Sequence, residues 1–133
     1  MEIIFISSVF ITLLFFLSGF NKIKEFISVA KGLSSKTRFP LALAKIVIVC
    51  VILLEIVGPF IISIYTYTHN PFLRGYAILS VLGLLIFTVL ATILYHFPPQ
   101  GPNYYSFMSN LSTIGGLMLL LLFIQSNTFY KSI

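Results

Sequence analysis

Charge is what this sequence has least of. Charged residues make up 8% of the 133 residues, and only three are acidic, whereas soluble domains carry about 25% charged residues. Hydrophobic residues account for 59% of the chain, and its mean hydropathy is +1.08. A soluble domain of this size could not bury so much apolar surface. The composition therefore predicts an integral membrane protein, with the lipid bilayer as its surroundings.

Cysteine is almost missing as well, since Cys50 is the only one. A single cysteine excludes an internal disulfide, a CxxC dithiol and a cysteine zinc site within one chain. The two histidines, His69 and His96, are 27 residues apart, about 40 Å along a helix, which is too far to clamp one haem. We therefore expect no haem or metal within one chain. The start MEIIFIS lacks a basic region, so no cleaved signal peptide is expected.

Four apolar segments are long enough to cross a bilayer as helices. They cover residues 3–20, 41–65, 72–97 and 107–125. Period-two alternation is missing, which argues against a membrane β-barrel, and open strands would leave unpaired edges in lipid. The pattern predicts an all-α membrane protein with one domain, residues 1–133. Its four transmembrane helices should form an up-down-up-down bundle.

The segment after the first span, FNKIKEFISVAKGL, has the pattern of an amphipathic helix. Its apolar side chains fall on one face and its charged side chains on the other. We expect this helix to lie in the membrane interface and to end at Gly32, because glycine favours helix C-termini. Pro40 should open the second span. The proline-rich loop HFPPQGPNYY should be non-helical.

Basic residues gather at one side of this arrangement. The first and third loops and their flanking ends hold six of the eight: Lys22, Lys24, Lys31, Lys36, Arg38 and Lys45. The other side holds Arg74 and Lys131. The positive-inside rule then predicts that the first and third loops are cytoplasmic, or equivalent, with both termini on the opposite side. The same clustering fits membrane orientation better than nucleic-acid binding. Either a bacterial plasma membrane or an organelle inner membrane fits.

Glu55 stands alone in the apolar run ILLEIVGPFIISIY. If hydrocarbon starts near Ile46, Glu55 lies about 14 Å deep, where a charge costs at least about 2.5–3.5 kcal/mol. It should therefore face the bundle interior, either protonated or paired. Two interpretations stay open: a carboxylate that carries protons or binds a ligand, or one that fixes helix packing. Gly58 and Pro59 follow within one turn and either kink the helix for packing or free a carbonyl for a ligand.

Three more polar residues should meet at the end of the bundle that holds the first and third loops. Lys22 ends the first span, His96 ends the third, and Asn110 begins the fourth. With Glu55 they would form a polar path from mid-membrane to one surface. Each also has a plainer interpretation. Lys22 could reach the interface as an anchor, while His96 and Asn110 could make ordinary interfacial or interhelical hydrogen bonds.

Small residues recur at helical spacing in the fourth span. Ser112 and Gly116 are four residues apart, with Gly115 beside them. Such residues let helices approach closely. The pattern predicts packing within the bundle, between copies of the chain, or against other membrane subunits.

Taken together, these motifs resemble the DoxX-like family of small four-span membrane proteins. The first span ends in GFNK, similar to the family's glycine–x–x–lysine, and Glu55 is followed by Gly58. The third span ends in His96, and the fourth begins NLSTIGGLMLL, similar to the family's asparagine-leucine and glycine-glycine pattern. The resemblance covers residues 10–123. It implies a four-helix fold and association with membrane redox systems, including the small subunit of thiosulfate–quinone oxidoreductase.

Three functions fit these residues. The first is an accessory or structural subunit of a larger membrane assembly, of redox or respiratory type, and without catalysis of its own. The lack of a cofactor motif and of a cysteine pair favours this one. The second is a redox subunit that presents Glu55, His96 and Lys22 to a quinone or a bound lipid. The third and weaker one is a small transporter or membrane chaperone.

The charge distribution generates a topology prediction. A reporter or glycosylation acceptor inserted between Ser34 and Ser35 should remain on the cytoplasmic side, because basic loops resist translocation. The matched insertion between His69 and Asn70 should report the opposite side. Modification of the Ser34–Ser35 insertion in the outer compartment would invert the whole topology.

Overall fold

The computed structural model describes residues 2–131, and the side chains of residues 3–126. Over this range all regular secondary structure is helical, and there is no strand. The five helices are α1 (Glu2–Lys24), α2 (Phe26–Thr37), α3 (Leu41–Thr68), α4 (Pro71–His96) and α5 (Asn103–Lys131). By length and composition, α1, α3, α4 and α5 can each cross a membrane. The four long apolar helices expected from the sequence are therefore confirmed.

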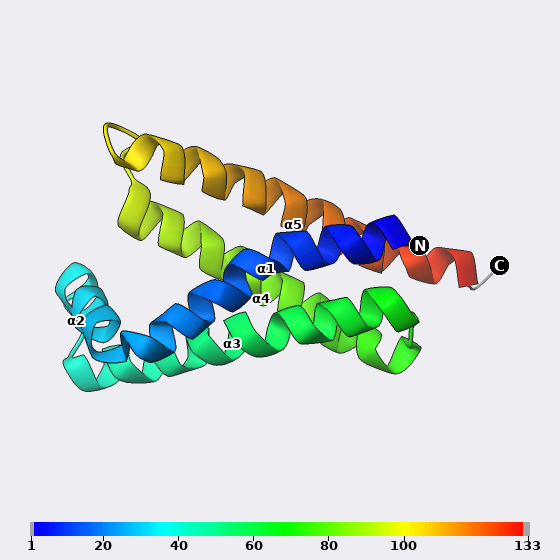
Figure 1. Ribbon diagram of the computed structural model, residues 1–133, viewed down its shortest axis with the longest axis horizontal. Helices are drawn as coiled ribbons and strands as arrows, with labels where there is room; N and C mark the ends of the chain where they lie inside the picture. The colour runs from blue at the N-terminus through cyan, green and yellow to red at the C-terminus, as the bar shows by residue number, and fades with distance from the viewer. Residues whose placement is uncertain (1, 132–133) are drawn as a thin grey trace.

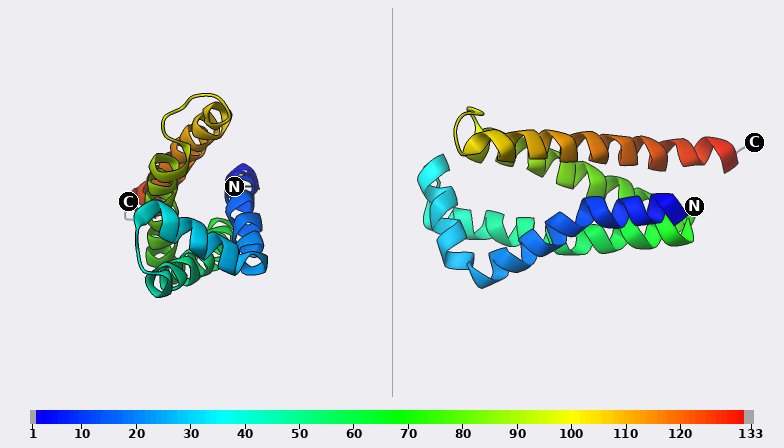
Figure 2. Two further views of the ribbon diagram at one scale, coloured as in Figure 1. Left: turned by 90° about the vertical axis from the view of Figure 1, so that its left-hand side faces the viewer. Right: turned by 45° about the horizontal axis from the view of Figure 1, so that its top comes forward.

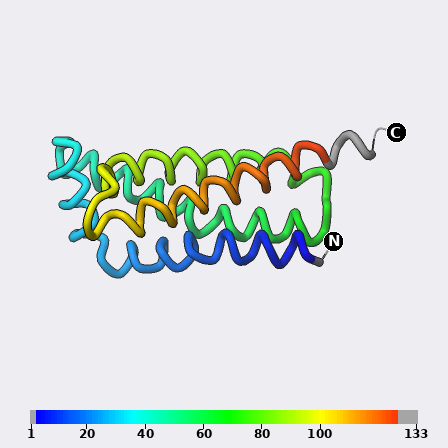
Figure 3. The backbone as a smooth tube through the Cα atoms, turned by 90° about the horizontal axis from the view of Figure 1, so that it is seen from above, coloured from blue at the N-terminus to red at the C-terminus, as the bar shows by residue number. Residues whose placement is uncertain are grey.

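The four long helices alternate in direction along one axis (Figures 1 and 3). Helix α1 packs on α3, α3 on α4, and α4 on α5, while α5 touches α1 only over a short stretch. Seen from the end, the helices form an open U rather than an evenly closed square (Figure 2). Helix α3 has the most extensive contacts, which it makes with α1, α2 and α4.

Helix α2 is a separate helix rather than a continuation of α1. The backbone bends at Glu25, which has φ −111° and ψ 33°, and α2 then lies across the end of the bundle (Figures 1 and 2). The expectation that this helix ends at Gly32 is wrong, since it continues to Thr37 and is capped by Arg38, whose φ is 61°. The helix continues past Gly32 because side chains on either side of this glycine are buried against α3. Its apolar side chains pack on the first turns of α3 in a cluster of Ala30, Leu33, Ala44 and Ile48.

The other helix ends follow ordinary capping chemistry. Pro40 directly precedes α3, as expected. Asn70 caps α4, because its side-chain oxygen accepts a hydrogen bond from the Phe72 N–H at 3.0 Å, with Pro71 at the first helical position. Helix α5 already begins at Asn103. The last residues of HFPPQGPNYY are therefore helical, contrary to the expectation for the whole loop.

Two glycines determine how closely α1 and α4 approach α3. A Cβ atom on Gly19 of α1 would lie 2.9 Å from Cγ1 of Ile56 and 3.1 Å from Cβ of Glu55. A Cβ atom on Gly83 of α4 would lie 2.9 Å from Cδ1 of Leu54. The two glycines thus flank the same turn of α3. Neighbouring helices can approach this turn closely because neither carries a side chain there.

This close approach predicts the effect of one added methyl group. Gly19→Ala should lower the free energy of unfolding by about 1–3 kcal/mol, because α1 must move away from α3. Gly115→Ala is the matched control, since no atom of another helix lies within 4 Å of the place its new methyl group would take and the gain in helix propensity is the same. Thermal unfolding of both variants in detergent, followed by circular dichroism, measures the difference. Equal midpoints would contradict the proposed close contact.

Candidate functional site

Glu55 is fully buried, and its partner is Lys22. The Nζ atom of Lys22 lies 3.0 Å from Oε2 and 3.1 Å from Oε1 of Glu55, so one ammonium bridges both carboxylate oxygens. Glu55 is 0% exposed, and the Lys22 side chain is 17% exposed. Glu55 therefore faces inward, as expected. Of the two states considered for it, protonated or paired, the structure has the paired one.

Two further groups complete the surroundings of the ammonium. The Ser18 hydroxyl accepts a hydrogen bond from Lys22 Nζ and donates one to Oε1 of Glu55 at 3.4 Å. The Phe87 ring of α4 has its centroid 5.5 Å from Nζ, within reach of a cation–π interaction. Neither residue was predicted from the sequence. A serine four residues before a lysine was an available signal for Ser18, but nothing in the sequence singled out Phe87.

Gly19 makes this ion pair geometrically possible. Because it has no side chain, α1 approaches α3 directly at Glu55. Helical side chains lean toward the N-terminus of their helix, so Lys22 reaches back one turn to the level of Ser18 and Gly19. The motif GFNK thus combines a glycine that allows close approach with a lysine that neutralises the facing carboxylate.

His96 and Asn110 do not join this pair. Asn110 Nδ2 donates a hydrogen bond to Oγ1 of Thr92 at 2.9 Å, which ties α5 to α4. Nδ1 of His96 is buried and makes no hydrogen bond within residues 3–126. The expected polar path is therefore divided. One part is the ion pair between α1 and α3, and the other is the amide–hydroxyl bond between α4 and α5.

The small residues expected to pack do so unequally. Gly58 and Pro59 are buried, and a Cβ atom on Gly58 would lie 3.6 Å from the nearest α4 side chain. A Cβ atom on Gly116 would lie 3.4 Å from the nearest α1 side chain. Ser112 and Gly115 are exposed instead. Within one chain, only three of the five positions serve helix packing.

Comparison of this chain with protein-family models, curated proteins and solved structures finds no match. In the part of the chain whose side chains are described, no three His, Cys, Asp or Glu residues are grouped as metal ligands.

The geometry predicts that breaking the pair from one side costs more than removing both partners. Lys22→Met leaves a buried carboxylate unpaired, and Glu55→Leu leaves the ammonium unpaired. Lys22→Met should lower the free energy of unfolding by about 3–5 kcal/mol. Glu55→Leu should cost less, because the Lys22 side chain is 17% exposed and its ammonium can extend to the interface. The double variant Lys22→Met/Glu55→Leu should lose much less than the sum of the two single losses. The wild type, the two single variants and the double variant form a double-mutant cycle. Unfolding of the four purified proteins in detergent measures their free energies of unfolding.

Two controls sharpen the cycle. Ser18→Ala removes the two hydrogen bonds of one hydroxyl but no charge, and it should cost about 0.6–2 kcal/mol. Asn110→Ala combined with Glu55→Leu should be additive, because Asn110 bonds Thr92 rather than Glu55. Simple additivity of the Lys22 and Glu55 losses would show that the two side chains are not coupled.

Proposed function

We propose that this chain is an accessory or structural subunit of a larger membrane assembly, and that the Lys22–Glu55 pair serves its own fold. The supporting observation is that Glu55 is 0% exposed while Lys22 engages both of its oxygens. A ligand could reach this carboxylate only after Lys22 had moved away. The packing interpretation of Glu55 is therefore favoured over the ligand-binding one.

We therefore assign the function to the lipid-facing exterior. Of the four long helices, α5 has the smallest buried share. It packs mainly on α4. Its other side exposes the large apolar residues Leu111, Met118, Leu119 and Leu122. Ser112 and Gly115 are exposed on the same helix, and small residues allow a second helix to approach closely. We assign this face of α5 to contact with a larger integral membrane protein.

The DoxX-like relationship and the membrane orientation are parts of the same proposal. Gly19, Lys22 and Glu55 all belong to the motifs of the resemblance, and they meet in a single contact. That contact supports treating these motifs as one structural unit. The six basic residues at the α2 end support a cytoplasmic position for the first and third loops. The transverse position of α2 supports its location in the interface (Figure 2).

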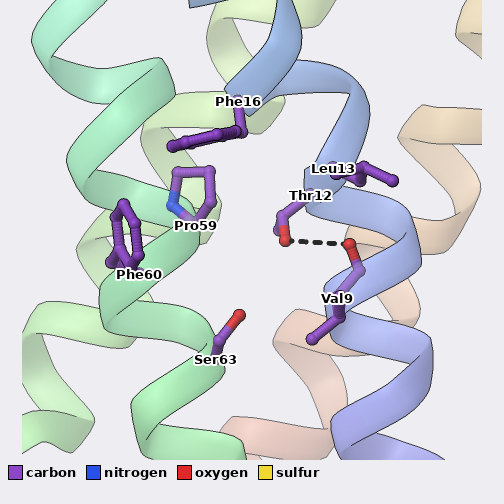
Figure 4. A pocket seen from close by; sticks show the side chains of 7 residues that line it. All are labelled: Val9, Thr12, Leu13, Phe16, Pro59, Phe60 and Ser63. Atoms are coloured by element: carbon purple, nitrogen blue, oxygen red, sulfur yellow. Dashed lines mark hydrogen bonds between the residues drawn. The ribbon is translucent and has the colours of Figure 1, made fainter.

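Binding of a quinone or a lipid-like molecule is the second candidate, and a groove between α1 and α3 favours it. The groove has a volume of about 160 Å³. It is lined by Val9, Thr12, Leu13, Phe16, Pro59, Phe60 and Ser63 (Figure 4). The rings of Phe16 and Phe60 meet edge to face, with centroids 5.5 Å apart. Because the lining is mostly apolar and excludes Lys22 and Glu55, hydrocarbon contacts would hold a ligand there.

Crosslinking in native membranes, followed by purification in mild detergent, tests the accessory role. The tagged wild type should carry a membrane protein partner in fixed stoichiometry. Gly115→Phe should lose this partner, because the ring prevents close approach to α5. Cys50→Phe is the matched control, since Cys50 is also small and exposed but lies on α3. It should keep the partner.

Other outcomes would redirect the assignment. A wild-type chain that purifies without a stoichiometric partner contradicts the accessory role. A quinone recovered from such a preparation by organic extraction and mass spectrometry would favour the groove between α1 and α3. Loss of the partner in Cys50→Phe but not in Gly115→Phe would move the contact from α5 to α3.

A further inference from the structure

The α2 end of the molecule carries an excess of positive charge that the chain does not neutralise. It holds Lys22, Lys24, Lys31, Lys36, Arg38 and Lys45 against Glu25 and Glu55. Lys22 is neutralised by Glu55. Five basic residues therefore remain against a single carboxylate, Glu25. At the opposite end the sequence provides Arg74 and Lys131 against Glu2.

Part of this charge lies directly beside exposed apolar side chains. At the bend between α1 and α2, Ile23 and Ile27 are 52% and 49% exposed. Lys24, which follows Ile23, and Lys31, one helical turn after Ile27, are exposed as well. A hollow at this bend is lined by residues 23–28, which include Lys24 and Glu25, while Lys31 lies outside the lining. The apolar exterior of α1 leads to the same bend, since Phe20 is 47% exposed. An apolar surface thus continues into a cationic one.

Helix α2 is held in position, so this arrangement is fixed by the fold. Ala30 and Leu33 are buried in the cluster formed with α3. Lys36 lies over the Tyr95 ring of α4, with Nζ 4.9 Å from the ring centroid. One side of α2 is thereby attached to the bundle. Lys31 remains exposed and takes no part in these attachments.

We propose that the bend between α1 and α2 binds the headgroup of an anionic phospholipid. Lys24 and Lys31 contact the phosphate, whose negative charge is not offset by a cationic headgroup. Ile23 and Ile27 lie against the first carbons of the acyl chains. Charge complementarity selects the lipid, because cationic side chains near a membrane attract anionic headgroups. A zwitterionic headgroup such as phosphocholine carries no net charge, so its electrostatic attraction to the two lysines is much weaker. This surface does not depend on the proposed accessory role, because the chain forms it alone.

Photolabelling of the purified, reconstituted protein tests this surface. The chain is placed in vesicles made of equal parts of phosphatidylcholine and phosphatidylglycerol. A trace of phosphatidylglycerol with a diazirine at the top of one acyl chain is the probe, and the same diazirine on phosphatidylcholine is the comparison. After irradiation, peptide mapping should find the phosphatidylglycerol label concentrated at residues 23–31. The phosphatidylcholine label should be spread over the lipid-facing helices.

Two double variants separate charge from shape. Lys24→Gln/Lys31→Gln should reduce the preference for phosphatidylglycerol at the bend by about 10- to 30-fold, given the usual contribution of each cation near an anionic surface. Lys24→Arg/Lys31→Arg keeps both charges and should retain the preference. Both variants should match the wild type in helix content, since neither lysine is buried.

Three results would overturn the proposal. The first is equal labelling of the bend by the two probes. The second is an unchanged preference in Lys24→Gln/Lys31→Gln. The third is loss of the label when inorganic phosphate is added to the buffer, which would indicate a site for soluble anions instead. None of these measurements includes a partner protein, so their outcome is separate from that of the accessory role.

Discussion

The arrangement of this chain depends on one constraint: neither Lys22 nor Glu55 can be left unpaired inside hydrocarbon. Their pairing fixes which turn of α1 faces which turn of α3. Gly19 then lets the two backbones approach, and Gly83 does the same for α4 on the other side. A buried ion pair adds little net stability compared with a good apolar contact, but a wrong register would leave both charges stranded. The pair therefore selects the register more than it strengthens the interface.

Polar contacts divide the bundle into two halves. Helices α1 and α3 are joined by the ion pair and, nearer the other end, by the hydroxyl groups of Ser8 and Thr66, 2.9 Å apart. Helices α4 and α5 are joined by Asn110 and Thr92, and at their far end by Arg74, which donates to backbone carbonyls of α5. Between α3 and α4 the contact is mainly apolar packing around Leu54 and Gly83.

The sequence predicted those features that bilayer thickness and charge burial dictate. The four spans followed from their lengths, and the inward position of Glu55 followed from its cost in lipid. The grouping of His96 and Asn110 with Glu55 was not obtained, because a shared level along the bundle does not fix the rotation of each helix about its axis. Gly32 illustrates another limit. Its local preference to end a helix was outweighed by the burial of side chains around it, which only the folded chain reveals.

The pairing of α1 with α3 also bears on how the chain enters the membrane. Both helices precede α4 and α5 in the chain, so the carboxylate of α3 can meet the ammonium of α1 before α4 and α5 have been made. Lys22 lies near the end of α1, where its side chain can stay at the water boundary until then. The polypeptide can therefore insert as a helical hairpin whose two charges cancel. Neutralising Glu55 in the lipid then requires no charge from α4 or α5.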